Sequence, residues 1–416
     1  MGLSKTIRRV FSLLLISLVF FQNQNVQCQI LSTDNNAVSL TTFQTLGNSN
    51  KGSLVASPFS LRTMMAMLMA GAQGNTREQI KTVMKFPTDE EKLFTTFQEY
   101  IQQLNSPSEV KTEVASRVFL KEGFLIKENF QNVLKHYFQS PLQQINFGKP
   151  KKAAEEINNF VSTKTNHRIQ KIVDASDLTN QTRMVLVNTL YFKGAWENPF
   201  PTTSTRRMPF YLDDTRNVQV DMMRLETYYR AVDIKELDCK AVLIPYQKGK
   251  KEEDTFQMVI LLPNKRTGLA NLEKGLNDFG LVDQVFNVRP RNIELRMPRF
   301  NIESSLELIE PLKQMGITDV FDENKSDLGA IPSESKATTP KDKKENQLYV
   351  SKVVQKAFLT VDEAGSEAGA ATLSVVFVPL SIGPPVEEVI SVDRPFFGFI
   401  RDAKTKTILF TFKKTD

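Results

Sequence analysis

The sequence predicts an α+β fold in which helices from the N-terminal third pack on mainly antiparallel β-sheets formed by the rest of the chain. Apolar residues recur at helical spacing before about residue 183, and β-branched and aromatic runs bounded by turn formers follow. The middle of the chain contains no Gly/Ser-rich or Pro-rich linker. One large domain over residues 29–416 is therefore expected.

The helical part contains three amphipathic segments. They are residues 59–76, 89–104 and 153–165. The first is expected to end at Gly71 and Gly74, since glycine terminates helices.

The second part contains strand-like segments rich in β-branched and aromatic residues. They are residues 184–192, 240–246, 255–263, 293–300 and two strands around a charged turn within 396–412. By contrast, residues 332–347 are polar, lysine-rich and contain two prolines, which is typical of a mobile surface insertion.

The N-terminus has the pattern of a secretory signal peptide. Three basic residues precede an apolar run of about 12 residues (10–21), and Val26 and Cys28 suit the small-residue cleavage rule. A spanning helix needs about 20 apolar residues, so a signal anchor is the less favoured alternative. We expect residues 1–28 to be removed and the mature chain to be secreted and extracellular, without a membrane span.

Composition and motifs argue against several functional classes. The formal net charge of +6 is mildly basic and does not indicate a nucleic-acid partner. Of the two histidines, His136 is expected at a partly buried helix position and His167 just after a helix; neither lies in a catalytic or metal-binding motif. Nucleophile elbows, phosphate-binding loops and dinucleotide fingerprints are absent from the sequence. The sequence thus predicts neither an enzyme nor a bound metal or cofactor. Cys239 would be the only cysteine of the mature chain.

Six segments together resemble the serpin family of serine protease inhibitors, and the resemblance covers essentially the whole mature chain. They are "ASPFSLRTMMAMLMAGAQGNT" (56–76), "VNTLYFKGAWENPF" (187–200), "LRMPRFNIE" (295–303), "LKQMGITDVFDENKSDLGAI" (312–331), "YVSKVVQKAFLTVDEAGSEAGAAT" (349–372) and "DRPFFGFIRD" (393–402). The resemblance implies a monomer with an exposed reactive-centre loop at about residues 363–392. A target serine protease cuts this loop and remains covalently attached, while the loop inserts into the main sheet.

The beginning of this loop, which we call the hinge, has the composition that insertion requires. It comprises Glu363, Gly365, Ser366, Glu367, Ala368, Gly369, Ala370, Ala371 and Thr372. Small side chains can pass between packed strands without overpacking. In an extended strand the even-numbered residues from Ser366 share one face, and Glu367 lies on the other. The alternative is a non-inhibitory serpin that acts as a carrier or binding protein.

The segment "VPLSIGPP" is similar to the bait sequence of antitrypsin-like serpins, which implies a reactive bond between Leu380 and Ser381. The family's usual spacing from Glu363 would instead place the cut after Pro379; Phe377 and Val378 are secondary sites. An apolar residue at the cut favours a chymotrypsin-like or elastase-like target. From Glu363 to Leu380 the extended chain spans about 56 Å, which suffices to carry a protease along the molecule.

The resemblance also implies a polar "shutter" cluster beneath the sheet. Its positions here are Ser57, Ser60, Asn188 and Gln355, the last in place of the family's usual histidine. An amide donates and accepts hydrogen bonds but does not titrate. Gln355 can therefore be read as tolerated packing or as a tuning residue.

Peripheral sites are predicted from surface motifs. Basic runs that could bind a heparin-like polyanion are Lys149, Lys151 and Lys152, then Lys248, Lys250 and Lys251, then Lys341, Lys343 and Lys344. Asn180 and Asn324 are glycosylation acceptors in a secreted chain. The overall style resembles secreted arthropod serpins, with a further similarity to mosquito salivary anticoagulant serpins directed at coagulation factor Xa.

Overall fold

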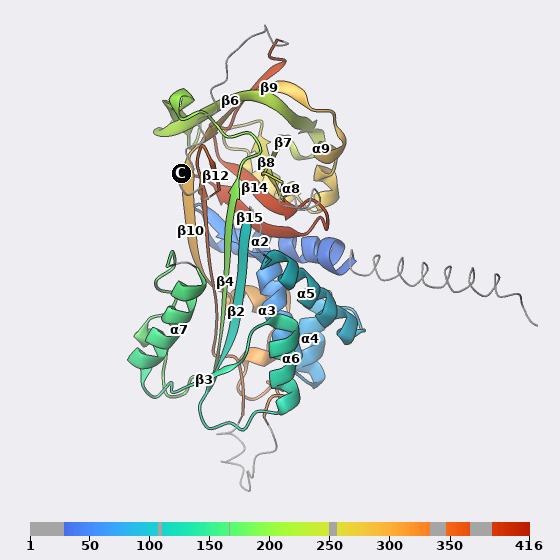
Figure 1. The fold of residues 1–416 in the computed structure, drawn as a ribbon, viewed down its shortest axis with the longest axis vertical. Helices are drawn as coiled ribbons and strands as arrows, with labels where there is room; N and C mark the ends of the chain where they lie inside the picture. Colours follow the sequence, from blue (N-terminus) through green and yellow to red (C-terminus); the bar gives the residue numbers. More distant parts are fainter. Residues whose placement is uncertain (1–28, 107–109, 166, 249–255, 333–346, 367–384) are drawn as a thin grey trace, which may run out of the picture.

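The computed structural model describes residues 29–106, 110–165, 167–248, 256–332, 347–366 and 385–416, and it confirms the α+β class (Figure 1). The main helices are α2 (Asn35–Ser49), α3 (Pro58–Met69), α4 (Gly74–Val83), α5 (Glu90–Leu104), α6 (Glu128–Phe138), α7 (Pro150–Lys164), α8 (Leu269–Gly275), α9 (Gln284–Asn287) and α10 (Ile309–Met315). The predicted signal peptide, residues 1–28, lies outside the described residues.

The strands fall into two sheets. They are β1 (Leu54–Ala56), β2 (Lys111–Lys121), β3 (Gln143–Ile145), β4 (Met184–Ala195), β5 (Arg206–Tyr211), β6 (Asn217–Ile234), β7 (Cys239–Pro245), β8 (Phe256–Pro263), β9 (Arg291–Pro298), β10 (Phe300–Glu307), β11 (Lys352–Val361), β12 (Gly365–Ser366), β13 (Glu388–Ser391), β14 (Phe396–Asp402) and β15 (Ile408–Lys414).

Within the described residues the first sheet has six strands in the order β10-β11-β12-β4-β2-β3. The second has the order β1-β15-β14-β8-β7-β6-β9-β13, with β5 paired to β6. Most neighbours are antiparallel, as expected, but β11–β4, β2–β3 and β13–β9 are parallel. The long strand β6 pairs with β9 along one part of its length and with β7 along another.

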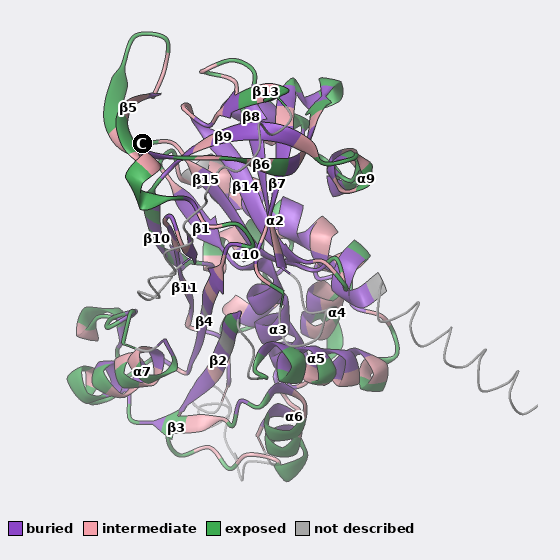
Figure 2. Ribbon diagram, turned by 45° about the horizontal axis from the view of Figure 1, so that its top comes forward, coloured by how far each residue is buried: buried purple, intermediate pink, exposed green. Residues whose placement is uncertain are grey.

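Both faces of the six-stranded sheet are covered in the region of β4. Leu186 belongs to the main core, into which helix α3 is inserted with all of its residues buried (Figure 2). Val185 and Val187 belong to a second core, to which Ile157 and Val161 of α7 contribute. Successive residues of a strand point to opposite faces, so the beginning of β4, Met184 to Val187, is apolar at every position.

The predicted elements are largely confirmed, with three corrections. The helix predicted over 59–76 ends at Met69, and a separate helix begins at Gly74, where φ is +49°. The strand predicted over 293–300 is divided at Arg299, which joins β9 to β10. His136 does lie in a helix but is exposed rather than partly buried.

The other expectations have mixed outcomes. His167 follows α7 as predicted, and Cys239 is a free, buried cysteine. Most of the predicted polar insertion, residues 333–346, lies outside the described residues. Among the residues that the structure does describe, none of the helices is both long enough and apolar enough to span a membrane.

Candidate functional site

Strands β4 and β11 lie side by side along part of their length and separate beyond it. They pair in parallel from Val185 with Lys352 to Leu190 with Ala357. Beyond this point β12 lies between them. Ser366 pairs with Gly194 of β4 and with Val361 of β11. The start of the hinge is thus already a strand of the sheet.

A tight turn reverses the chain between β11 and β12. The side-chain Oδ1 of Asp362 accepts hydrogen bonds from the backbone N–H groups of Ala364 (2.9 Å) and Gly365 (3.1 Å). A Cβ at Gly365 would lie 2.1 Å from the carbonyl oxygen of Gly194. Only glycine allows this close approach of the two backbones, which explains one of the side-chain-poor positions in the hinge.

Glu363 anchors the hinge at the top of the sheet. Its carboxylate is almost buried and accepts a hydrogen bond from Thr205 Oγ1 (2.6 Å), with the Nε of Arg299 at 3.5 Å. Its backbone carbonyl accepts from the N–H of Phe200 (2.8 Å). Because main chain and side chain are both held, Glu363 fixes the point from which the loop departs.

Two aromatic residues hold the turn before β12 and β12 itself in place. Trp196 donates from its backbone N–H to the carbonyl of Ala364 and from Nε1 to the carbonyl of Asp362, both at 2.9 Å. Tyr246 stacks on Trp196 with ring centroids 4.5 Å apart. The Tyr246 hydroxyl lies 2.6 Å from Ser366 Oγ, and both residues are buried. Burial raises the pKa of Tyr246, so the phenol is neutral and can act as a hydrogen-bond donor.

The shutter residues predicted from the sequence come together below β12. Gln355 Oε1 accepts from the backbone N–H of Ser57 (2.8 Å), and Gln355 Nε2 donates to the Ser57 carbonyl and to Asn188 Oδ1, both at 2.9 Å. Asn188 Nδ2 donates to Ser116 Oγ at 2.8 Å. Gln355 therefore links β11, β4 and the beginning of α3, because Ser57 is the N-cap residue of that helix.

Ser60 participates differently from the other shutter residues. Its backbone N–H donates to Ser57 Oγ at 3.3 Å, whereas its own buried hydroxyl has no hydrogen-bond partner. Ser116 was missed from the sequence, as were Trp196 and Tyr246 at the hinge. Trp196 is the only tryptophan of the chain, and that is the single sequence signal that could have identified it.

Several predicted site residues lie outside the described residues. They are the reactive bond at Leu380 and Ser381, the secondary sites Phe377, Val378 and Pro379, the hinge residues Glu367 to Thr372, and Lys250, Lys251, Lys341, Lys343 and Lys344. On the far side of the loop, β13 pairs in parallel with β9. The carboxylate of Glu388 in β13 pairs with Lys240 of β7 (2.8 Å) and Arg291 of β9 (2.9 Å).

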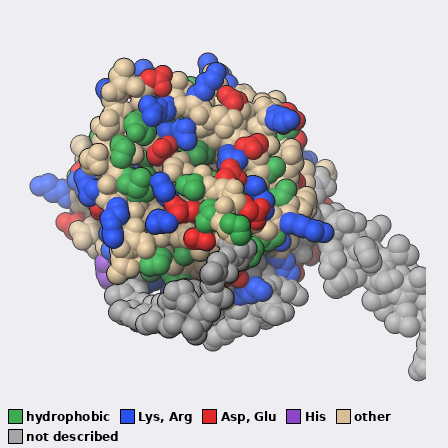
Figure 3. All heavy atoms as spheres, turned by 90° about the horizontal axis from the view of Figure 1, so that it is seen from above, with side chains coloured by type: hydrophobic (Ala, Val, Ile, Leu, Met, Phe, Trp, Pro, Cys, Tyr) green, Lys and Arg blue, Asp and Glu red, His purple; other side chains and the backbone are tan. Residues whose placement is uncertain are grey.

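The peripheral candidates that are described lie at the surface. Lys149, Lys151, Lys152 and Lys248 are exposed, as are Asn180 and Asn324. Viewed from above, the molecule shows cationic, anionic and hydrophobic side chains interspersed, without a large area of one charge (Figure 3). Within the described ranges no cluster of His, Cys, Asp or Glu is arranged to hold a metal ion.

A sequence profile of the serpin (serine protease inhibitor) family matches residues 33–414. The chain belongs to the serpin family. It is thus a protease inhibitor and not an enzyme. Among curated relatives it is similar to Iripin-8 of Ixodes ricinus, with 32% identity over 91% of this chain and 92% of the relative. It is also similar to Antichymotrypsin-2 of Bombyx mori, with 30% identity over 89% of this chain and 95% of the relative.

A solved serpin has the same fold. Serpin48 of the insect Tenebrio molitor superimposes with a TM-score of 0.80 at 28% sequence identity, covering 93% of this chain and 98% of its own. The parted strands, the hinge and the polar cluster described above are therefore parts of a serpin's main sheet.

We predict that Gln355→Leu lowers the thermal unfolding midpoint substantially. The substitution removes the hydrogen-bond partner of two buried groups, the backbone N–H of Ser57 and Oδ1 of Asn188, at a cost of about 3 kcal/mol. The matched control is Ser60→Ala, which removes a buried hydroxyl without a partner and should change stability little. Equal effects of the two substitutions in differential scanning calorimetry would contradict the assigned network.

A second prediction concerns the contribution of the hydrogen bond between Tyr246 and Ser366 to stability. Tyr246→Phe and Ser366→Ala should each lower stability by about 1 kcal/mol, and the double variant should cost little more than either single one. Tyr229→Phe is the control, because the buried Tyr229 hydroxyl has no hydrogen-bond partner. Strictly additive single effects would show that the two hydroxyl groups do not interact.

Proposed function

We propose that this serpin is secreted and that it traps a chymotrypsin-like or elastase-like serine protease by cleavage after Leu380 and insertion of the hinge into the six-stranded sheet. The observation that carries the proposal is the position of Ser366, buried and paired on both sides between β4 and β11. A loop whose first residues already form a strand can extend that strand without changing its register.

The register of β12 determines which residues of β4 and β11 each later hinge residue would lie between after insertion. Continuing the pairing of Ser366 with Gly194 and Val361 brings Gly369 between Tyr191 and Phe358. These two rings lie on one face with their centroids 5.7 Å apart. Of all residues, glycine displaces them least as it passes.

The same continuation brings Thr372 between Asn188 and Gln355. Its hydroxyl would lie on the face of the sheet that carries both amides, because Thr372 has the parity of Ser366. Insertion must break the hydrogen bond between Gln355 and Asn188, and a threonine hydroxyl can donate to one amide and accept from the other. In the same way, Glu367 would come opposite Lys193, an oppositely charged cross-strand partner.

The chemistry of trapping starts as ordinary proteolysis. The protease serine attacks the carbonyl carbon of Leu380, the bond to Ser381 breaks, and the new amino terminus leaves while the serine ester remains. Insertion of the released hinge then carries the attached protease along the sheet. Distortion of the protease by this transfer prevents water from hydrolysing the ester. No catalytic group of the serpin is required.

Four observations support the finer parts of the proposal. Leu380 suits an apolar specificity pocket, and one relative is named Antichymotrypsin-2. The basic and then apolar pattern of residues 1–28 supports secretion. Similarity to tick and insect serpins supports the arthropod type. The similarity to mosquito salivary serpins makes coagulation factor Xa the second target to test.

The proposal predicts an SDS-stable complex with chymotrypsin or elastase. The experiment incubates the purified chain with chymotrypsin, neutrophil elastase, trypsin and factor Xa, with and without heparin, and determines the N-terminus of the released fragment. A fragment that begins at Ser381 supports cleavage after Leu380. Cleavage by all four proteases without any complex would contradict inhibition and favour the carrier alternative, and acceleration by heparin would support the basic candidates.

Substitution of a hinge residue should separate cleavage from trapping. Ala370 would come opposite Ala357, which is fully buried. Ala370→Arg places a charge at that position, so insertion slows and the stoichiometry of inhibition should rise at least about tenfold while the loop is still cut. Glu367→Gln, on the opposite face, is the matched control and should inhibit nearly as well as the parent. An unchanged stoichiometry for Ala370→Arg would refute the register.

A further inference from the structure

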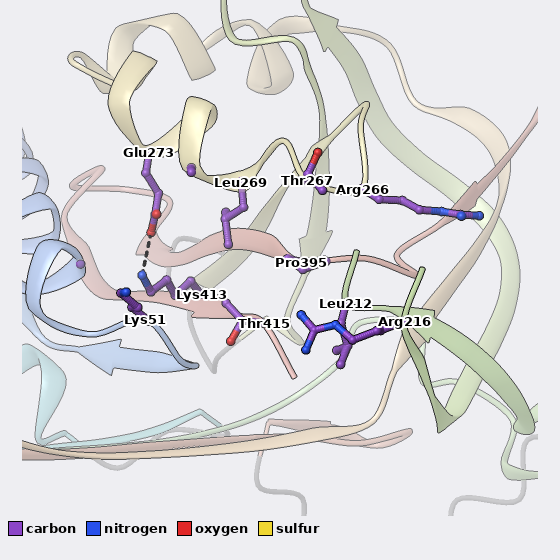
Figure 4. Close-up of a pocket in the computed structure, with 12 residues that line it drawn as sticks. Lys51, Leu212, Arg216, Arg266, Thr267, Leu269, Glu273, Pro395, Lys413 and Thr415 are labelled. Atoms are coloured by element: carbon purple, nitrogen blue, oxygen red, sulfur yellow. Dashed lines mark ion pairs between the residues drawn. The ribbon is translucent and has the colours of Figure 1, made fainter. Parts of the chain in front are cut away.

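A cavity of about 490 Å³ lies away from the hinge, between the C-terminal end of α2, helix α8 and the ends of the core strands β14 and β15 (Figure 4). This volume falls in the range of small-molecule sites, about 300–1,000 Å³. Residues from distant parts of the chain line it, including Lys51 after α2, Leu212 and Arg216 at the turn between β5 and β6, and Lys413 of β15. The proposed inhibitory mechanism makes no use of this cavity.

The middle of the cavity is apolar. Leu269 at the beginning of α8 and Pro395 before β14 are both buried residues that line it, and Leu212 contributes from the facing turn. Figure 4 shows the side chain of Leu269 directed into the space between α8 and the strands. A ring or short hydrocarbon chain placed here would lose contact with water against three apolar side chains, which is favourable.

Charged groups lie at the two ends of this apolar stretch. At one end, Lys51 lies beside the ion pair of Lys413 with Glu273 (3.2 Å), and the Lys413 side chain is only 4% exposed. At the other end, Arg216 is paired with Asp213 at 2.6 Å.

The cations are not equally available to a ligand. The guanidinium of Arg266 stacks over the ring of Tyr211 at 3.6 Å and extends away from the cavity. Lys413 and Arg216 have carboxylate partners, whereas Lys51 forms no ion pair with any described residue. The unbalanced positive charge of the cavity is therefore at Lys51.

We propose that this cavity binds a small organic anion, with an apolar ring or chain against Leu212, Leu269 and Pro395 and one carboxylate or sulfonate group on Lys51. An apolar stretch beside one available cation favours such a molecule over a neutral one of the same shape, because the anionic group gains the contact with Lys51. This binding site is additional to the inhibitory loop and does not depend on it.

A larger side chain at Gly47 would fill the cavity and so provides a test of the site. A Cβ at this position would be 3.6 Å from Glu273 Oε1 and 3.7 Å from Lys413 Nζ, which is ordinary contact distance. Gly47→Met would therefore project a side chain over the ion pair into the cavity without a backbone clash. Methionine is also a better helix former than glycine, so α2 should be retained.

The experiment titrates the full chain with anilinonaphthalene sulfonate and measures binding by fluorescence and by isothermal titration calorimetry. The same titration with the uncharged phenylnaphthylamine shows how much of the affinity depends on the anionic group. We expect one site, with affinity about three- to fivefold weaker for Lys51→Gln and for the uncharged probe. Gly47→Met should abolish binding at this site. Lys274→Gln, on the same helix as Leu269 but outside the lining, is the control and should bind as the parent does.

Absence of binding, or equal binding by the parent, Lys51→Gln and Gly47→Met, would overturn the proposal, because the probe would then lie elsewhere. Protease trapping is measured on the same variants and should be unchanged. Absence of trapping by the parent chain would count against the proposed function, whereas absence of probe binding by the parent would count against this site. Loss of trapping in Lys51→Gln or Gly47→Met would contradict the independence of the two sites.

Discussion

The hydrogen bonds that Gln355 makes to Asn188 and Ser57 are the polar link that an inserting strand would have to break in the main sheet. Within the shutter cluster the bond to Asn188 joins β11 to β4 directly, and the two bonds to Ser57 attach Gln355 to the beginning of helix α3. Above them the strands are already parted by β12, so the sheet is open at one end. Lower down, the parallel backbone pairing of β4 with β11 and the bond between Gln355 and Asn188 hold it closed. The behaviour of the loop depends on the balance between these two regions.

The two regions differ in what an inserting strand would gain. At the hinge, Ser366 has both backbone ladders and a buried partner in Tyr246. At the shutter, Gln355 and Asn188 already have hydrogen-bond partners without the loop, so the strand can pass between them only by replacing an existing hydrogen bond. A neutral amide at Gln355 makes this replacement independent of pH in the physiological range, since no group in the bridge titrates there.

Much of the fold follows from local patterns in the sequence. Helix α5 is predictable because Asp89 caps it and its apolar residues recur at helical spacing. Strands β8 and β14 are nearly continuous apolar runs. Strand β2 begins with the polar run "KTE", and β6 is half exposed with mixed residues, so neither has the composition that marks a buried strand.

The site was only partly predictable for a different reason. Ser57, Asn188 and Gln355 could be located through the family resemblance, but their partners depend on contacts between distant segments. Ser116 is 72 residues from Asn188, and Tyr246 is 120 residues from Ser366. No local pattern specifies such contacts. The ion pair of Lys413 with Glu273 beside the cavity is likewise a product of the tertiary fold.

The most direct test of the account is the thermal midpoint of the chain before and after its reactive loop is cut by a protease that it does not trap. The cut chain can insert the hinge along the whole path from Ser366 to the shutter, adding two ladders of backbone hydrogen bonds. The account predicts a midpoint far above that of the intact chain. An unchanged or lower midpoint after cleavage would show that the hinge does not extend β12 into the sheet, and it would contradict the central claim.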